Sequence, residues 1–267
     1  LARMWEWQLR VNTAMRRGSA AAGKVKSRMG TKLLPKKTIN KIEKIINIAN
    51  KNKQKSLSAL ESNEILNLGA IKMVPSAKVK NLAEAQKFVK SQNWPVVLKI
   101  SSPHLLHKTE GGGVILNINS QIKLEQAWKK IIQIAGKLPD KSLTAIQIQK
   151  QAASGLEVIA GVKYNQDFGQ VLMFGAGGIA VELLNEAKFK FLPIDANGAE
   201  ELIKSSKIYP LLKGYRKQKS YAINKLVEIM VRLSSLAQAT SFAEIEINPI
   251  IITNSDALAV DARIILS

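Results

Sequence analysis

The sequence predicts a mixed α/β fold, of the α+β kind, for most of a chain of 267 residues. From residue 57 onwards, segments with the period of strands alternate with segments with the period of helices, which is typical of this class. Hydrophobic residues make up 46% of the chain, so a sizeable core is available and global disorder is excluded. We expect no membrane segment, because no apolar run approaches the roughly 18 residues that a transmembrane helix needs.

The first 56 residues are expected to form a basic extension, part of it disordered. Residues 1–60 contain 15 lysines and arginines and two acidic residues, a net charge of +13 out of +20 for the whole chain. Residues 1–29 lack periodicity and are left out of the expected fold. A short helix is expected at 38–50, where isoleucines recur at helical spacing after Thr38. A solvated tail explains this charge most simply, although such a tail can also bind nucleic acid or anionic lipid.

Further helices are expected where apolar residues recur at helical spacing. Gly69 provides a stop signal for the first of them. They are expected at 57–68, 81–92, 121–134, 199–206 and 219–237.

Strands are expected where short apolar or alternating runs are bounded by turn residues. Pro75 ends the first run, and residues 144–149 alternate as a half-buried strand does. The strands are expected at 71–74, 95–100, 114–118, 144–149, 157–162, 171–174, 179–184, 244–252 and 257–264.

Lys99 lies inside the apolar strand expected at 95–100. Burying a lysine is costly unless an anion or an acid meets it, and a phosphate is one candidate. The alternative is a strand edge with one polar face in water.

Both histidines of the chain, His104 and His107, lie in one loop beside Lys108 and three glycines. These glycines let the backbone approach a ligand closely, and their successive amides can form a nest for an anion. The three residues are Gly111, Gly112 and Gly113. A neutral imidazole is a nucleophile near neutral pH, so this loop could carry a phosphoryl group. A glycine-rich surface turn with incidental histidines is the alternative, and the spacing is not that of a Walker A loop.

The two C-terminal strands are expected to form a hairpin with Asn254-Ser255 as its two-residue loop. In that register Asn248 faces Asp261 and Glu246 faces Arg263, and all four lie on one face. Asn248 and Asp261 offer the oxygen ligands that Mg²⁺ prefers, while Arg263 could hold Glu246 or a phosphate. A cross-strand ion pair with a hydrogen bond is the structural alternative.

The chain contains no cysteine. This excludes disulfides, thiolate nucleophiles and cysteine-based zinc sites, and it fits a reducing compartment. We therefore expect a cytoplasmic protein.

Together these segments resemble the ATP-grasp domain of NDP-forming acyl-CoA synthetases, and among them the beta subunits of ADP-forming acetyl-CoA synthetases. The likeness runs through residues 57–267 in the order of that family. The segments that carry it are Pro95–Pro103, Leu106–Thr109, Gly112–Val114, Gly155–Val158, Met173–Gly178, Tyr209–Arg216, Glu246–Pro249 and Val260–Arg263. The resemblance implies an ATP-grasp fold with a small subdomain at about 76–148 and a larger one at about 149–267 plus 57–75.

The resemblance also implies roles for individual residues in a phosphotransfer step between a phosphohistidine and ADP or ATP. His107 would relay the phosphoryl group, and Lys99 would hold the nucleotide phosphates. Gln149 and Gln151 would meet adenine, and Glu157 would meet ribose or orient Lys99. Asn248 and Asp261 would bind Mg²⁺.

Several positions depart from the family pattern. His104 stands where an acidic residue is usual, and Glu246 stands where aspartate is usual. None of the departures removes a proposed nucleotide, metal or phosphate ligand. The sequence has no recognisable CoA-binding domain and no domain with the family's first phosphohistidine. We therefore expect an alpha subunit or domain as partner, in a hetero-oligomer or a fused enzyme.

Two other functions remain open from the sequence. A non-catalytic ATP-grasp-like regulatory module of a larger protein would conserve the same fold. A basic nucleic-acid-binding protein would need an aromatic or groove-reading surface, and only 5% of residues are aromatic.

Overall fold

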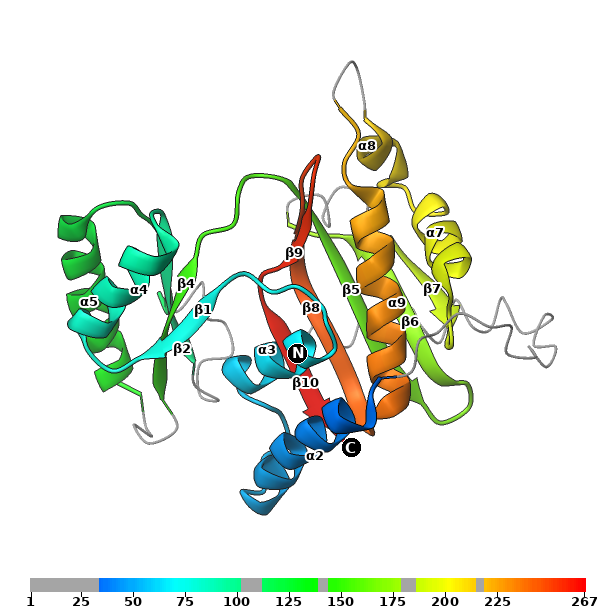
Figure 1. The fold of residues 1–267 in the computed structure, drawn as a ribbon, viewed down its shortest axis with the longest axis horizontal. Coiled ribbons are helices and arrows are strands. Elements are labelled where there is room, and N and C mark those ends of the chain that lie inside the picture. The colour runs from blue at the N-terminus through cyan, green and yellow to red at the C-terminus, as the bar shows by residue number, and fades with distance from the viewer. Residues whose placement is uncertain (1–33, 102–111, 139–143, 179–185, 215–218) are drawn as a thin grey trace.

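Two antiparallel β-sheets with helices packed on them organise the chain (Figure 1). The computed structural model describes residues 34–101, 112–138, 144–178, 186–214 and 219–267. A four-stranded sheet belongs to what we call the small unit (described residues of 76–150), and a six-stranded sheet belongs to the large unit (the other described residues). Each unit has its own hydrophobic cluster, and we propose that the units correspond to the two expected subdomains. The expected mixed α/β class is confirmed.

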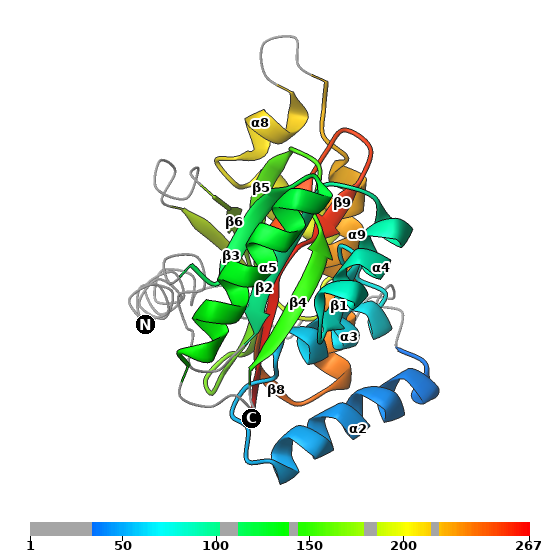
Figure 2. The same ribbon diagram turned by 90° about the vertical axis from the view of Figure 1, so that its left-hand side faces the viewer.

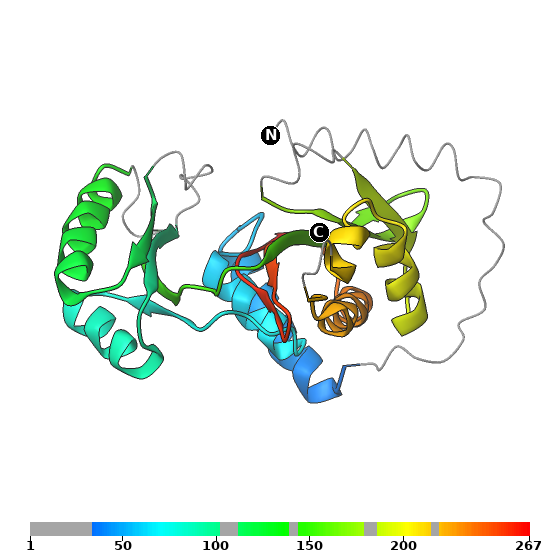
Figure 3. The same cartoon turned by 90° about the horizontal axis from the view of Figure 1, so that it is seen from above.

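The small unit is a sheet in the order β1-β4-β2-β3 with two helices on one face. Its elements are β1 (Ser76–Val79), α4 (Leu82–Gln92), β2 (Val96–Ser101), β3 (Val114–Ile118), α5 (Gln121–Gly136) and β4 (Ala145–Lys150). The side chains of Asn81 and Ser120 cap the two helices by accepting a hydrogen bond from a backbone N–H in the first turn. Figure 2 shows both helices in front of the sheet, and Figure 3 shows them on the side away from the large unit. The other face of the small sheet is therefore turned toward the large unit.

The large unit is a sheet in the order β10-β8-β5-β6-β7, with the short strand β9 also paired to β8. Its strands are β5 (Leu156–Asn165), β6 (Gly169–Ala176), β7 (Ala187–Phe191), β8 (Phe242–Ile252), β9 (Ala257–Ala259) and β10 (Ala262–Leu266). Its helices are α2 (Lys36–Lys51), α3 (Ala59–Leu68), α7 (Ala196–Lys204), α8 (Tyr209–Lys213) and α9 (Ile223–Ala239). Helix α9 lies along the sheet in Figure 1 and buries Leu226, Met230 and Leu233 against it. Helix α9 therefore covers one face of the large sheet and does not cover the opposite face.

Helix α2 lies before the expected boundary at residue 57 and packs on the large unit. Its residues Ile42 and Ala49 are fully buried in the core of the large unit. The chain after it is also held there, because the backbone N–H of Leu57 donates to the carbonyl of Ile264 and that of Leu266 donates to the carbonyl of Lys55. The helix expected at 38–50 is therefore present, but the basic composition of residues 34–56 concealed its packing on the core.

The strand expected at 71–74 is not a sheet strand. This segment runs beside β9 and makes one bridge, between Met73 and Ala259, and the first strand of the small sheet begins only at Ser76. The segment is apolar because Ile71, Met73 and Val74 are buried, the first two in the core of the large unit, so burial rather than sheet pairing explains its pattern.

The other elements differ mainly at their ends. Helix α7 begins three residues before the expected start, because Asp195 caps it by accepting a hydrogen bond from the N–H of Gly198. Helix α8 and strand β7 were not expected from the sequence. The strand expected at 179–184 lies outside the described residues.

The C-terminal hairpin has the expected register. Arg263 pairs with Glu246, Ala262 with Ile247 and Ala257 with Ile252. The N–H of Thr253 donates to the carbonyl of Asp256, which closes the two-residue loop at Asn254-Ser255. The prediction was correct because period-two alternation and a two-residue loop together leave one register.

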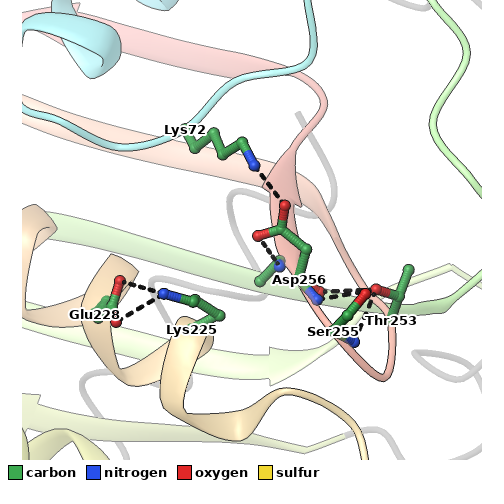
Figure 4. Close-up of polar contacts among 7 residues, drawn as sticks. Lys72, Lys225, Glu228, Thr253, Ser255 and Asp256 are labelled. Atoms are coloured by element: carbon green, nitrogen blue, oxygen red, sulfur yellow. Dashed lines mark hydrogen bonds and ion pairs between the residues drawn. The ribbon is translucent and has the colours of Figure 1, made fainter.

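An ion pair ties this hairpin to the segment that leads into the small unit (Figure 4). The Lys72 ammonium donates to the Asp256 carboxylate, whose other oxygen accepts from the N–H of Ala257. The lysine lowers the pKa of Asp256 through this hydrogen bond, against the raising effect of partial burial.

None of the described helices is long and apolar enough to cross a membrane.

Candidate functional site

A row of polar side chains lies buried on the face of the small sheet that is turned toward the large unit. Lys99 on β2 pairs with Gln147 on β4, and Gln149 and Ser101 lie on the same face by alternation. The intervening residues, such as Leu98 and Ile148, belong to the hydrophobic cluster on the other face. Lys99 is 8% exposed, Gln147 2% and Gln149 1%. Such burial of polar groups is costly in a purely structural sheet and is typical of a ligand site.

The segment between β9 and β10 faces this row from the large unit. The Gln149 Nε2 atom donates to the carbonyl oxygen of Val260 at 2.7 Å. The Nζ atom of Lys99 lies 3.9 Å from Oδ2 of Asp261. Two residues that the sequence assigned to phosphate and metal are thus brought together across the two units.

The predicted metal ligands are neighbours on the large sheet. The N–H of Asn248 donates to the carbonyl of Asp261 at 3.0 Å, so the two residues lie opposite each other as expected. The side-chain amide of Asn248 donates to Glu246 Oε1 at 3.2 Å, which orients its oxygen away from Glu246. Asp261 Oδ1 accepts from the N–H of Ala262, and Oδ2 faces Lys99.

This donor set fits Mg²⁺ bound together with a nucleotide. Mg²⁺ is usually held by one or two protein oxygens, with phosphates and waters completing the octahedron. Among the residues that the structure describes, no group of three or more histidine or acidic side chains is arranged to hold a metal ion without such help.

The face of the large sheet opposite its core is charged. It carries Glu244, Glu246, Lys163 and Arg263, in addition to the metal ligands. Arg263 pairs with Glu246 in the strand register, as the sequence predicted. The sequence analysis missed Glu244 and Lys163, which pair across β8 and β5 with Nζ and Oε2 3.6 Å apart. Burial raises the pKa of Glu244, against the lowering effect of Lys163, so its charged form is disfavoured.

Glu157 contacts the second glycine-rich turn. The carbonyl of Glu157 accepts a hydrogen bond from the N–H of Gly177, and a Cβ atom on Gly178 would lie 2.5 Å from Glu157 Oε2. Gly178 also has a φ of +55°, which favours glycine. The turn therefore needs glycine because it packs on Glu157, a relationship that spacing alone does not reveal.

Gln151 is occupied within the small unit. Its Oε1 accepts from the N–H of Asn117 and its Nε2 donates to Asn117 Oδ1, each at 2.8 Å. Asn117 thus uses both polar ends of the Gln151 amide. In this structure Gln151 therefore braces β3 and does not face Lys99 and Asp261, which lie near Gln149.

Gly112 and Gly113 lie beside the end of β2. The carbonyl of Gly113 accepts from the N–H of Ile100, and Gly112 has a φ of +68°. These glycines are therefore next to the strand that carries Lys99. His104, His107 and Gly111 lie outside the described residues.

The sequence matches the model of a known family. The family, described as an ATP-grasp domain, matches residues 48–266. The beta subunit of acetate–CoA ligase [ADP-forming] I from Pyrococcus furiosus is 41% identical over 209 residues, which cover 77% of this chain and 90% of that subunit. The chain belongs to the ATP-grasp family of ADP-forming acyl-CoA synthetases.

Fused relatives place this ATP-grasp domain within longer chains. Acetate–CoA ligase [ADP-forming] II from Archaeoglobus fulgidus is 33% identical over 77% of this chain, which spans 30% of the relative's length. The same domain therefore occurs both as a subunit and as part of a larger polypeptide.

A solved structure has the same fold. It is the dinucleotide forming acetyl-coenzyme A synthetase 1 of Ca. Korarchaeum cryptofilum in complex with coenzyme A and Mg-AMPPCP, with its phosphohistidine segment pointing towards the nucleotide binding site. The TM-score is 0.74 and the sequence identity is 31%. The match covers 85% of this chain and all of the other chain. The expected ATP-grasp fold is confirmed by this likeness.

Proposed function

We propose that this chain is the nucleotide-binding component of an ADP-forming acyl-CoA synthetase, acting on acetate or a similar acid. The observation that carries the proposal is the placement of Lys99 opposite Asp261, with Asn248 beside it. A cation and a pair of metal-binding oxygens that face each other are suited to hold the two sides of a nucleotide polyphosphate. The relatives' names supply the reaction class.

Each residue has a separate task in this proposal. Lys99 neutralises phosphate oxygens from the small unit, and the amides of Gly111, Gly112 and Gly113 are assigned as further donors to the phosphates. Asn248 and Asp261 hold Mg²⁺ from the large unit. The metal supplies charge neutralisation of the phosphates as the phosphoryl group moves. Arg263, which lies opposite Glu246 in the strand register, is assigned to Glu246 or to a nucleotide phosphate.

The transfer itself is assigned to His107. A neutral imidazole nitrogen attacks the γ-phosphorus of ATP, the bond from that phosphorus to the β–γ bridging oxygen breaks, and ADP leaves. The phosphoryl group then passes to an acceptor histidine of an alpha subunit or domain, and the reverse sequence makes ATP. Glu157 is assigned to the ribose.

Reconstitution tests this function. The chain alone should bind Mg²⁺-ADP but should form no ATP from acetyl-CoA, ADP and phosphate. When the alpha component from the same source is added, ATP should form at a rate proportional to the concentration of the complex. Nucleotide binding without turnover in a stable complex would instead identify a regulatory module, and no nucleotide binding at all would refute the proposal.

A further inference from the structure

Gln147 is a buried polar residue of the candidate site that the proposed function does not use. It lies on β4, the strand between β1 and β2 in the small sheet, and it is 2% exposed. Its chain neighbours Ile146 and Ile148 belong to the hydrophobic cluster, so Gln147 lies on the opposite face, which carries Lys99. Burying an amide costs free energy unless the amide is hydrogen-bonded, and an apolar residue would suit a purely structural position. The amide therefore points to a task in the site.

Two lysines flank Gln147 in the strand register. It pairs with Lys99 on β2 on one side and with Lys78 on β1 on the other. Residues directly opposite each other on one face have Cβ atoms about 4.5–5.5 Å apart, so the amide of Gln147 is within reach of the Lys99 ammonium group. An extended glutamine side chain ends one bond short of an extended lysine side chain. The amide therefore reaches the ammonium group before it reaches a phosphate that the ammonium group holds.

The chemistry of an amide suits this position between two cations. A glutamate would neutralise a lysine and repel phosphate, whereas a glutamine accepts a hydrogen bond and adds no charge. Such an acceptor is useful once Mg²⁺ occupies Asp261, whose Oδ2 atom lies 3.9 Å from the Nζ atom of Lys99. The ammonium group has three donors, so Gln147 can take one of them while the other two face phosphate oxygens.

We infer that Gln147 is a positioning residue, whose amide oxygen accepts a hydrogen bond from the Lys99 ammonium group and directs that group to the nucleotide phosphates. The inference rests on the proposed function, because these are the phosphates that Lys99 holds there. Gln147 acts through Lys99 and does not itself contact the nucleotide. The next residue on the same face, Gln149, is used differently, because its Nε2 atom donates to the carbonyl of Val260.

A double-mutant cycle tests whether Gln147 acts through Lys99. Calorimetry on the full chain measures the binding of Mg²⁺-ADP and of adenosine to the wild type, Gln147→Met, Lys99→Met and the double variant. Gln147→Met keeps a similar length and removes the acceptor, so ADP affinity should fall about fivefold, which corresponds to about 1 kcal/mol. In the Lys99→Met background, the same change should alter ADP affinity by less than about twofold. Adenosine affinity should stay the same in all four proteins, because adenosine carries no phosphate.

A second glutamine provides the matched control. Gln121 lies at the exposed start of α5, where its amide donates to Glu125. Gln121→Met should leave the affinities for Mg²⁺-ADP and adenosine unchanged.

The outcomes separate the inference from the function on which it rests. If the wild type does not bind Mg²⁺-ADP, the proposed function fails and the inference fails with it. If the wild type binds ADP and Gln147→Met binds it equally well, the inference alone is refuted. A fivefold loss that persists in the Lys99→Met background also refutes the inference, because Gln147 would then act on the nucleotide independently.

Two further results would assign Gln147 to the stability of the sheet instead. One is an equal loss of affinity for ADP and for adenosine in Gln147→Met. The other concerns folding: if Gln147→Met does not fold, Gln147→Leu is taken through the same cycle, and failure of both variants to fold refutes the inference.

Discussion

Lys99 and Asp261 approach to 3.9 Å across the two units of the chain, one on strand β2 of the small sheet and the other between strands β9 and β10 of the C-terminal hairpin. The Lys99 side chain is 10% exposed and the Asp261 side chain 30%, so water screens this pair less than a surface ion pair. A nucleotide with Mg²⁺ would separate the two charges and give each a partner of opposite sign.

The metal role of Asp261 predicts a selective loss in binding. Asp261→Ala should weaken the binding of Mg²⁺-ADP by at least about tenfold and change the binding of metal-free ADP much less, because a carboxylate repels phosphate unless a cation lies between them. Titration calorimetry with and without Mg²⁺ measures both. Asp256→Ala, in the same hairpin but paired with Lys72, is the control and should leave the effect of Mg²⁺ unchanged. Equal losses in the two titrations for Asp261→Ala would favour a structural role.

The phosphate role of Lys99 predicts discrimination by the ligand's charge. Lys99→Met keeps much of the side-chain volume and removes the charge, so ADP affinity should fall by about tenfold or more while adenosine binds as before. Thermal unfolding of the same variant shows whether the site is still folded. A lower melting temperature with unchanged ADP affinity would show that Lys99 has only a structural role.

Replacing Glu244 by glutamine is predicted to increase the stability of the protein in a pH-dependent way. The pKa of Glu244 is raised by burial, so the folded state favours the protonated form, and the carboxylate costs stability once the pH rises above the folded-state pKa. Glu244→Gln should therefore raise the free energy of unfolding near pH 8 by at most about 1 kcal/mol, because Lys163 already compensates part of the burial. The gain should shrink as the pH falls through the pKa of Glu244.

Urea unfolding at several pH values measures this gain. Lys163→Met provides the opposite case, since it leaves the Glu244 carboxylate without its partner and should lower stability near pH 8. A Glu244→Gln protein that is less stable than the wild type at that pH would show that the ion pair outweighs burial.

Helix α2 predicts a contrast between two isoleucines. Ile42 is fully buried and Ile48 is 58% exposed on the same helix. Ile42→Ala should lower the free energy of unfolding by roughly 2–4 kcal/mol, whereas Ile48→Ala should change it by less than about 0.5 kcal/mol. Equal effects in urea unfolding would mean that α2 does not pack on the large unit in solution.

The hairpin and the positions of its residues could be predicted because they depend on local rules. Alternation and a two-residue loop fix the register, and the register places Asn248 opposite Asp261. The approach of Lys99 to Asp261 depends on how two units pack, and no local pattern contains that information. Here the family resemblance, rather than the strand pattern, suggested that both residues serve one nucleotide.

Other features could not be found for more specific reasons. The helix at 38–50 was expected, but its packing was missed because charge dominates its composition, while its core contacts come from Ile42 and Ala49. Gln151 was grouped with Gln149 by position, but its amide pairs with Asn117, whose φ of +60° reshapes the end of β3. Glu244 and Lys163 lie on neighbouring strands far apart in the sequence, so their pairing follows only from the sheet order.

Phosphate transfer to the protein tests the central claim most directly. The full chain is incubated with γ-labelled ATP and Mg²⁺, and the labelled product is examined for stability in acid and base and mapped by peptide analysis. The account predicts label that is acid-labile and base-stable, that maps to His107, and that disappears in His107→Ala while His104→Ala keeps most of it. Label on His104, or full labelling and partner-dependent turnover in His107→Ala, would contradict the account.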